Sequence, residues 1–426
     1  MSSTPWAGRR LHFIGVGGAG MSGLALVARA LGAVVTGSDQ AESSYVELLR
    51  QAGVQPVIGH DAANLPDGAE VVVSTAIGDD NPELAAARER GAAILHRGDL
   101  LGEVSRLRRT IAVAGTHGKT TTASMAAHVL VETGRDPCYL IGGEVRSTGT
   151  NAAWGEGEWL VVEADESDRS FLKLSPEVAV VTNVELDHHA TFATLGELQE
   201  AFGQFTAGAR VVIDDVELPD VELLPLGSRF SALGADFELA VPGRHNAQNA
   251  LAAVLACREA GVDPADSARA LRSFAGAGRR FEPHGDGPAG SQVYDDYAHH
   301  PTEVRATLEA ARTLGGGRVV AAFQPHLYSR TRALASDFGK ALALADVAVV
   351  LDIYPAREHA ADFPGVSGWL VAAAAADAAG GRPVYWTPGA DQAERLLREE
   401  LRSGDVVLTL GAGNIDSLAR ALTTAG

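Results

Sequence analysis

Residues that could bind phosphate lie in the stretch Ala112–Thr122, AVAGTHGKTTT. An apolar run ends there in a Gly-x-x-Gly turn, which is followed by Lys119 and three threonines. A turn of this kind between a strand and a helix points several backbone N–H groups at one place, where the helix N-terminus adds partial positive charge. The lysine can reach the β- and γ-phosphates of a nucleotide, and the hydroxyl after it can bind Mg²⁺. The predicted phosphate-binding residues are Gly115, Thr116, His117, Gly118, Lys119, Thr120 and Thr121.

Lysine is scarce in this chain, which makes its presence in the turn informative. Lysines and arginines together number 35, and the lysines other than Lys119 are Lys173 and Lys340. The motif is shorter than the standard Walker pattern, so a plain strand-to-helix turn with a solvated lysine remains an alternative. The sequence nevertheless favours a nucleotide site.

A second glycine-rich turn, GVGGAG, occupies residues 15–20, and Asp39 follows about twenty residues later. Taken alone, this pattern predicts a nicotinamide dinucleotide site and an oxidoreductase. The same arrangement of N–H groups and a helix terminus can equally hold the pyrophosphate of another nucleotide. The residues concerned are Gly15, Gly17, Gly18, Ala19 and Gly20.

Carboxylates and carboxamides follow other apolar runs. Glu163 ends WLVVE at the kind of sheet edge where α/β proteins build their sites. Asn246 and Asn249 are three residues apart, so they can share one helix face, and their amides suit the edge of an adenine base. Helix capping by Asn246 is the alternative.

The elements that must position these residues are short buried strands separated by helix-length segments, which indicates α/β structure with mostly parallel sheets. A further stretch, 371–381, is predicted as a helix stopped by glycine. The expected strands are 11–16, 33–39, 71–77, 110–115, 159–165, 178–184, 318–324, 347–354 and 406–411.

Three domains are expected, because strand signals restart after the basic segment SRLRRT (105–110) and after the Gly- and Pro-rich stretch 276–290. They are residues 1–106, Rossmann-like; 107–280, a P-loop-type ATPase; and 281–426, again Rossmann-like.

Composition limits the partners. The net charge of −19 argues against binding to nucleic acid or to an anionic membrane. Cys138 and Cys257 lack metal-ligand spacing and are expected to be buried reduced thiols. We expect no secretory signal and no membrane-spanning segment, and hence a cytoplasmic protein.

Six further motifs accompany GTHGKTTT in an order that resembles the Mur ligase family, whose members use ATP to add amino acids to UDP-N-acetylmuramate. These motifs are FIGVGGAGMSGLA, EADESD (163–168), TNVELDHH (182–189), GRHNAQNA (243–250), DDYAHHPTE (295–303) and FQPHLYSRT (323–331). The resemblance implies L-alanine as the amino acid, with a ligase that attaches a recycled peptide to the same sugar as the neighbouring possibility. A nicotinamide oxidoreductase would leave GTHGKTT unexplained, and a nucleotide-binding regulatory protein without turnover would not need EADESD or DHH.

The resemblance also implies roles for individual residues. It makes Thr120, Glu163 and His188 ligands of Mg²⁺, and it assigns ATP binding to His245, Asn246, Asn249 and Asp296 as well as to the phosphate turn. Catalysis is expected at Lys119, Glu163, His188, His299 and Arg330. UDP-sugar or amino-acid binding is expected at the turn 15–20, Asp39, Ser74, Thr75, Ala76, Glu166, Asp168 and His326.

One family feature is absent. Several Mur relatives support a second Mg²⁺ with a carbamylated lysine about fifteen residues after the metal-binding histidine. That count from His188 arrives at Gly203, and no lysine lies between Lys173 and Lys340. We therefore expect activity that does not depend on bicarbonate.

Overall fold

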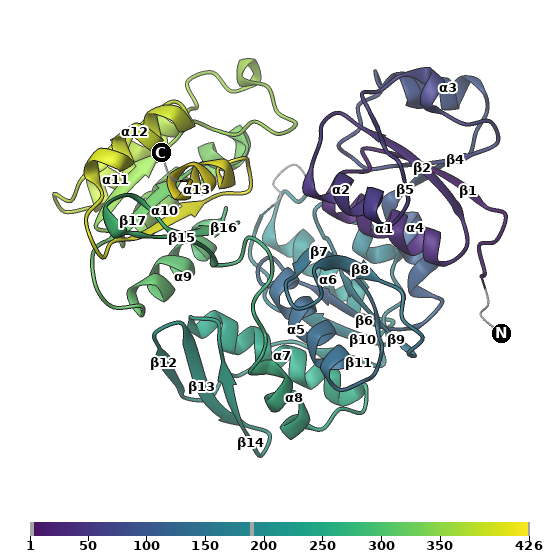
Figure 1. The fold of residues 1–426 in the computed structure, drawn as a ribbon, viewed down its shortest axis with the longest axis horizontal. Helices are drawn as coiled ribbons and strands as arrows, with labels where there is room; N and C mark the ends of the chain where they lie inside the picture. Colours follow the sequence, from purple (N-terminus) through teal and green to yellow (C-terminus); the bar gives the residue numbers. More distant parts are fainter. Residues whose placement is uncertain (1–3, 188–190, 425–426) are drawn as a thin grey trace. The chain divides into compact units, whose positions relative to one another are not determined.

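The computed structural model describes residues 4–187 and 191–424. Three mostly parallel sheets flanked by helices confirm the predicted α/β class (Figure 1). Tertiary packing divides the chain into two units, which are described separately. The first comprises the described residues of 1–186, 190–217 and 249–270, and the second those of 187–189, 218–248 and 271–426.

The first sheet is wholly parallel, with the order β3-β2-β1-β4-β5. Its connections run outward from β1 to β3 and then cross to β4, so the crevice between the ends of β1 and β4 is the topological switch point where α/β proteins bind ligands. The strands are β1 (Arg10–Ile14), β2 (Val34–Asp39), β3 (Val57–Ile58), β4 (Glu70–Val73) and β5 (Ile94–His96). The helices are α1 (Ala19–Ala30), α2 (Ser44–Gln51), α3 (Pro82–Glu89) and α4 (Arg97–Ser105).

The second sheet has the order β11-β10-β6-β9-β7-β8, with β8 antiparallel to β7 and the other pairs parallel. Its strands are β6 (Arg109–Ala114), β7 (Cys138–Val145), β8 (Thr150–Ala153), β9 (Trp159–Glu163), β10 (Val178–Val181) and β11 (Val211–Ile213). The associated helices are α5 (Lys119–Glu132), α6 (Leu195–Thr206), α7 (Arg244–Glu259) and α8 (Pro264–Leu271).

One hydrophobic core joins these first two sheets. It contains Leu24 of α1 together with Leu140 of β7 and Ala152 of β8. A polar contact reinforces it, because the Asn151 side-chain amide donates to the Ala19 carbonyl over 2.7 Å. The glycine turn that begins α1 is therefore anchored to the sheet that carries the phosphate turn.

The second unit contains an antiparallel sheet, β12 (Val221–Leu224), β13 (Gly227–Ala232) and β14 (Ala235–Leu239), which the sequence analysis did not predict. It also contains the third mixed sheet, with the order β15-β16-β20-β17-β18-β19. The strands of that sheet are β15 (Glu282–Asp286), β16 (Gln292–Asp296), β17 (Val319–Phe323), β18 (Val347–Val350), β19 (Val384–Trp386) and β20 (Val406–Leu410). Its helices are α9 (Pro301–Arg312), α10 (Tyr328–Leu342), α11 (Gly368–Ala378), α12 (Ala390–Glu400) and α13 (Asp416–Thr423).

Alternate residues of β17 enter two different cores. Val319, Ala321 and Phe323 lie on one face of the sheet, and Val320 and Ala322 lie on the other. Burial on both faces explains why this strand is apolar at every position.

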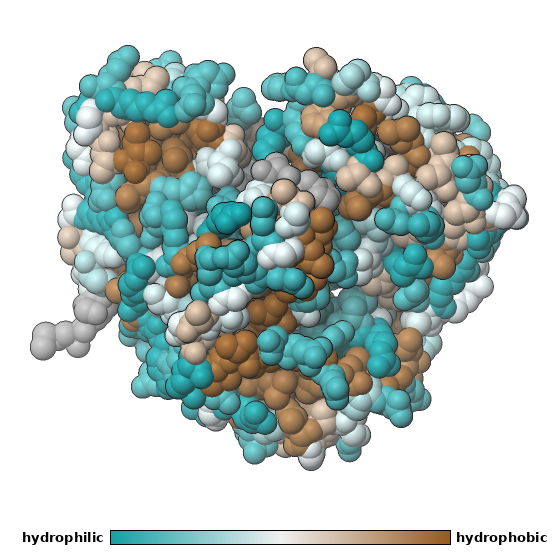
Figure 2. Space-filling model, turned by 180° about the vertical axis from the view of Figure 1, so that it is seen from behind, coloured by the Kyte–Doolittle hydropathy of each residue, from teal (hydrophilic) through white to brown (hydrophobic). Residues whose placement is uncertain are grey.

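All nine predicted strands are present, and all except β2, which ends at Asp39 as predicted, end one to four residues before their predicted ends. The predicted glycine-stopped helix is α11. Both cysteines are buried and free, as expected. None of the helices in the described ranges combines the length and apolar character that a membrane crossing requires. On the face drawn in Figure 2, hydrophilic residues surround several hydrophobic patches.

Candidate active site

The phosphate turn follows β6 and leads into α5. Gly115 has φ +132° and Gly118 has φ +82°, both in the region that disfavours side chains. There is also no space for a side chain at either position. A Cβ on Gly115 would lie 2.0 Å from Thr182 Oγ1, and a Cβ on Gly118 would lie 2.5 Å from Asn249 Oδ1. The two glycines are therefore required by the fold of the turn.

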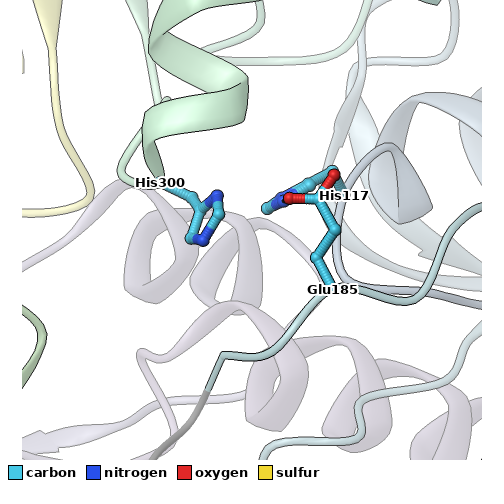
Figure 3. A group of neighbouring side chains, drawn as sticks. All are labelled: His117, Glu185 and His300. Carbon is cyan, nitrogen blue, oxygen red and sulfur yellow. The ribbon is translucent and has the colours of Figure 1, made fainter. Parts of the chain in front are cut away.

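The loop after β10 holds the turn from one side. The Thr116 N–H donates to the Asn183 carbonyl over 3.0 Å, and the His117 N–H donates to Asn183 Oδ1 over 2.9 Å. The His117 side chain lies beside Glu185 of the same loop, with Nε2 and Oε2 separated by 3.4 Å (Figure 3). These contacts hold the turn in place while leaving the first N–H groups of α5 outside the helical hydrogen-bond pattern.

Lys119 is enclosed by acceptors. Its Nζ donates to the Gly115 carbonyl over 2.6 Å and to Glu166 over 3.0 Å, and its side chain is 14% exposed. Burial lowers the pKa of Lys119, but the charges of Glu166, Asp165 and Glu163 outweigh burial and raise it. The lysine is thus a permanent cation at the N-terminus of α5.

Oxygen ligands for a hard cation lie next to this lysine. The Thr120 hydroxyl donates to both carboxylate oxygens of Glu163 over 3.0 and 3.1 Å. Glu163 ends β9, which pairs with β6 so that Glu163 is opposite Val113. A threonine hydroxyl and a carboxylate in contact are a donor set that fits Mg²⁺. The predicted third ligand, His188, lies outside the described residues.

The predicted adenine-binding residues lie on α7. Asn249 reaches the phosphate turn, where its Oδ1 occupies the space beside Gly118. Asn246 donates its side-chain amide to the Pro242 carbonyl over 2.7 Å, and burial lowers the pKa of the neighbouring His245 to about 4. His245 is therefore neutral at physiological pH.

The first glycine turn lies at the switch point of its sheet. The Gly17 N–H donates to Asp39 Oδ2 over 2.7 Å, so Asp39 shapes the turn from within. Ser74–Ala76 form a tight turn after β4, in which the Ala76 N–H donates to Ser74 Oγ over 3.3 Å. The neighbouring Ile77 side chain lies 3.0 Å from the position of a Cβ on Gly15, so the structure brings these two predicted substrate loops together.

An arginine that the sequence analysis missed lies between the first glycine turn and the acidic loop that follows β9. Arg97 begins α4 and donates to Asp165 over 2.7 Å and to Asp168 over 2.9 Å. Its Nη1 also lies 3.2 Å from where a Cβ on Gly20 would be. Arg97 thus links the turn of the first sheet to the acidic loop that follows β9.

In the second unit, several predicted catalytic and substrate-binding residues lie near the ends of β16 and β17. His299 Nδ1 is 3.0 Å from the Tyr297 carbonyl, and its ring meets that of His326 at 6.0 Å between centroids. Burial lowers the pKa of His299 to about 3. His326 Nδ1 lies 3.2 Å from an Arg330 guanidinium nitrogen.

Arg330 forms a buried ion pair that the sequence analysis did not predict. Its Nη2 lies 3.0 Å from both carboxylate oxygens of Asp187, and the two side chains are each 4% exposed. The predicted ribose ligand, Asp296, accepts N–H groups from Phe281 and Ala298 over 2.8 Å. Burial raises the pKa of Asp296 to about 6.

Arg97 and Asp187 could not have been found by spacing, because their partners are 68 and 143 residues away. The only available signal was their position inside motif-rich segments, at the start of HRGDLL and within ELDHH.

Family models match three consecutive parts of the chain. Residues 10–109 match the "Mur ligase family, catalytic domain", residues 113–217 the "Mur ligase middle domain", and residues 279–413 the "Mur ligase, glutamate ligase domain".

Relatives resemble the chain over nearly all of its length. A UDP-N-acetylmuramate–L-alanine ligase of Streptomyces coelicolor is 45% identical over 97% of each chain, and one of Rubrobacter xylanophilus is 44% identical over 95% of this chain and 97% of its own. Among solved structures, the UDP-N-acetylmuramate–alanine ligase of Thermotoga maritima has a TM-score of 0.83 and 30% identity, covering 97% of this chain and 98% of its own. A murein peptide ligase from Psychrobacter arcticus has a TM-score of 0.70 and 26% identity over 98% of each chain.

Proposed function

The chain belongs to the Mur ligase family, and from that membership we propose that it joins L-alanine to the lactyl carboxylate of UDP-N-acetylmuramate at the expense of ATP. The observation that carries the proposal is 45% identity over 97% of both chains to a ligase of that name. The recycling peptide ligase is not favoured, because the similar structure of that name is only 26% identical. The product is a precursor of peptidoglycan, made in the cytoplasm, where ATP is available.

The reaction must activate a carboxylate, because its oxygen is a poor leaving group. A lactyl carboxylate oxygen attacks the γ-phosphorus of ATP, ADP leaves, and an acyl-phosphate forms. The alanine nitrogen then attacks the acyl carbon, the C–O bond to phosphate breaks, and the nitrogen loses a proton. Lys119 and the N–H groups of the turn support the first step by stabilising charge on the transferring phosphoryl group.

The remaining contacts are assigned by location. We propose that the turn 15–20 and Ser74–Ala76 hold the UDP-sugar, and that Asp39 supports the conformation of the turn. Glu166 and Asp168 are assigned to the neighbourhood of the bound substrate. Asn246, Asn249, His245 and Asp296 are assigned to the nucleoside of ATP, and His299, His326 and Arg330 to the amino acid. The domain boundaries after residues 106 and 280 fit this division.

Magnesium binding is proposed at Thr120 and Glu163, whose oxygens are in contact and of the right type. The bound ion would neutralise charge on the ATP phosphates. His188 is retained as the predicted additional ligand.

No carbamate is proposed at this site. Lys173 donates to Asp99 over 2.6 Å, and a Cβ on Gly203 of α6 would meet nothing within 4 Å. Turnover should therefore be equal in degassed buffer and in buffer with added bicarbonate. A clear rise on adding bicarbonate that disappears in Lys173→Ala would contradict this assignment.

The function is tested by phosphate release with UDP-N-acetylmuramate, ATP and a panel of acceptors. L-Alanine should give the highest kcat/KM, and a recycled cell-wall peptide should give none. Lactyl carboxylate labelled with ¹⁸O should deliver one label to inorganic phosphate. Turnover of the recycled peptide but not of alanine would overturn the proposal, as would a label retained wholly in the amide and water.

A further inference from the structure

The hairpin of β7 and β8 contacts residues at both proposed substrate sites of the first unit. It lies beside α1, the helix that begins in the first glycine turn (Figure 1). It also reaches Glu163, the proposed magnesium ligand, because the Gly142 N–H of β7 donates to Glu163 Oε2 over 2.8 Å. One hairpin therefore touches the helix proposed for the UDP-sugar and the carboxylate proposed for the metal.

Asn151 of β8 makes the polar contact with the start of α1. Its side-chain amide donates to the Ala19 carbonyl over 2.7 Å and to Ser22 Oγ over 3.3 Å. The Ser22 hydroxyl donates to the same carbonyl over 3.0 Å. The side chains of Asn151 and Ser22 are fully buried, so water does not compete for these bonds. The first turn of α1 is thus held by a residue 132 positions away in the sequence.

This contact orients the end of α1 that would hold an anion. The first hydrogen bond of the helical pattern runs from the Ser22 N–H to the Gly18 carbonyl, so the N–H groups of residues 19–21 precede it and are directed out of the helix end. The Ala19 carbonyl and the Gly20 N–H belong to one planar peptide unit. By holding that carbonyl, Asn151 therefore sets the direction of an N–H group at the proposed pyrophosphate position.

Close packing leaves α1 little freedom to move against the hairpin. A Cβ on Gly23 of α1 would lie 3.1 Å from the Leu140 side chain, 3.3 Å from the Ala152 Cβ and 3.4 Å from Asn151 Nδ2. The missing side chain at Gly23 lets the helix approach the hairpin this closely. The position of α1 relative to the hairpin is therefore set by direct contact.

On the basis of the proposed function, we propose that Asn151 is a positioning residue for phosphoryl transfer to the UDP-sugar. The reacting carboxylate oxygen and the γ-phosphorus must come within about 3–3.5 Å of each other. Asn151 fixes the Ala19–Gly20 peptide to the hairpin whose Gly142 N–H holds Glu163, and so sets how far apart the two substrates are held. Because its side chain is buried, Asn151 acts through that peptide and not by touching a substrate.

Kinetics and calorimetry of Asn151→Leu test the proposal, because leucine keeps the branched shape and removes the donor. It also removes Oδ1, a buried acceptor without a hydrogen-bond partner among the described residues. A misplacement of about 1 Å can cost on the order of 100-fold in rate, so kcat should fall at least about tenfold. The dissociation constants of ATP and of UDP-N-acetylmuramate, each measured alone, should stay within about threefold, because each site remains intact.

Thr110→Val is the matched control. The Thr110 hydroxyl is fully buried and donates to the Ser105 carbonyl over 2.9 Å. It lies at the start of β6, whereas the phosphate turn follows the end of that strand. Valine keeps the shape and removes the donor, so kcat should equal that of the wild type. If Asn151 only stabilised the fold, Asn151→Leu would likewise leave kcat unchanged.

Hydrogen exchange of the full chain, read by mass spectrometry, tests the contact without the reaction. In Asn151→Leu, the peptide that covers the first turn of α1 should exchange faster than in the wild type, and β1 should exchange equally. Unchanged exchange in that peptide would overturn the proposal even if the wild type showed no turnover, a result that would itself refute the proposed function.

With an active wild type, the proposal is overturned by a kcat in Asn151→Leu that equals that of Thr110→Val. It is also overturned by dissociation constants that rise as far as kcat falls, since that pattern indicates a general distortion of the first unit. Thermal unfolding checks that Asn151→Leu is folded, and Asn151→Ala gives the same comparison if it is not.

Discussion

Lys119 is a cation whose present partners are carboxylates and carbonyls of its own chain. In the proposed ATP complex, the γ-phosphate would compete with Glu166 for this ammonium group, so the ion pair of Lys119 and Glu166 would set part of the free-energy cost of binding ATP. The same pair keeps the lysine charged and correctly placed before ATP arrives.

Replacing Lys119 by Ala should lower phosphate release by at least about 100-fold, because a group that stabilises the transferring phosphoryl charge is lost. UDP-N-acetylmuramate should still bind with nearly unchanged affinity in calorimetry, since the proposed UDP turn belongs to the first sheet. Lys340→Ala is the control, because Lys340 is an exposed residue of α10. An equal loss of phosphate release and of UDP-N-acetylmuramate affinity in Lys119→Ala would contradict the assignment of ATP and the UDP-sugar to different sheets.

Glu83 is the centre of a buried polar network beneath the first sheet. Its carboxylate is fully buried and lies 2.8 Å from His12 Nε2 and 2.7 Å from Ser38 Oγ. Asn64 also donates to it over 3.0 Å. Burial raises the pKa of Glu83, but the hydrogen bonds from His12, Ser38 and Asn64 outweigh burial and lower it to about 2.

Removing this carboxylate in Glu83→Ala should lower the free energy of unfolding of the first unit by about 3–5 kcal/mol at pH 7, because buried partners are left unpaired. A carboxyl with a lowered pKa in the folded state stabilises the protein above its unfolded pKa of about 4.3. The difference between variant and wild type should therefore shrink as the pH falls from about 4.3 towards 2. Urea unfolding at pH 7, 4 and 3 measures this trend, with exposed Glu89→Ala of the same helix as the control. A difference that stays constant with pH would contradict the role of the ionised carboxylate.

A functional residue could be predicted from the sequence where it lies in a recognisable motif. It could not be predicted where its partners become neighbours only in the folded chain. Lys119 and Glu163 could be identified because glycine turns and strand ends have recognisable patterns. Glu83, Arg97 and Asp187 are ordinary charged residues in sequence, and their partners become neighbours only after the chain has folded. Glu83 and Asp187 are buried and Arg97 is half-buried, and each is accommodated by polar or charged partners that are distant in sequence, so no local sequence pattern indicates these positions.

At the scale of elements, the strands were predictable and their ends were not. Runs such as VVAAF are apolar at every position because both faces of a parallel sheet are covered. The predicted strands extended too far into the following loops. Residues such as Thr182 and Asp165 belong to the same sequence motifs as the strands, although strand pairing ends before them. The antiparallel β12–β14 sheet was missed, since its short strands alternate polar and apolar residues and lack a helix between them.

The turn that begins α5 gives a test at this scale. Gly118→Ala should weaken ATP binding at least about tenfold, equivalent to 1.4 kcal/mol, because the new methyl group would displace Asn249 and alter the turn. Gly134→Ala, just beyond the other end of α5, also has positive φ at +70° but meets nothing within 4 Å. It should cost only the backbone strain of about 1–2 kcal/mol in stability and leave ATP affinity unchanged. Equal ATP affinity in the two variants, measured by calorimetry, would count against the role of Asn249.

At the scale of the whole molecule, the first two sheets share one large core, beside which the first sheet has a smaller cluster of its own around Ile14, Val71 and Leu84. Leu24 and Leu140 belong to one cluster, and a Cβ on Gly23 of α1 would already lie 3.1 Å from Leu140. The junction between them is therefore as closely packed as the interior of a domain, although each sheet carries a different glycine turn.

Hydrogen exchange in increasing urea should show this shared core directly. The amides of β1 and β6 should lose protection at the same urea concentration, because neither sheet can expose its half of the cluster without the other. Loss of protection in β1 well before β6, read by mass spectrometry, would show instead that the first sheet unfolds alone.

The scarcity of lysine, together with the enclosure of Lys119, has a consequence for covalent labelling. The three side chains are exposed to very different extents: 14% for Lys119, 41% for Lys173 and 62% for Lys340. An amine-acylating reagent attacks only the neutral amine, and the raised pKa of Lys119 makes that form rarer still. Trace acetylation therefore marks Lys340 first and Lys119 last, and the ratio of the two modified peptides reports how open the phosphate turn is. In a chain rich in lysine, the acetylated Lys119 peptide would be one of dozens of modified peptides. In this chain, Lys119 is one of three lysines, so its modification can be followed directly.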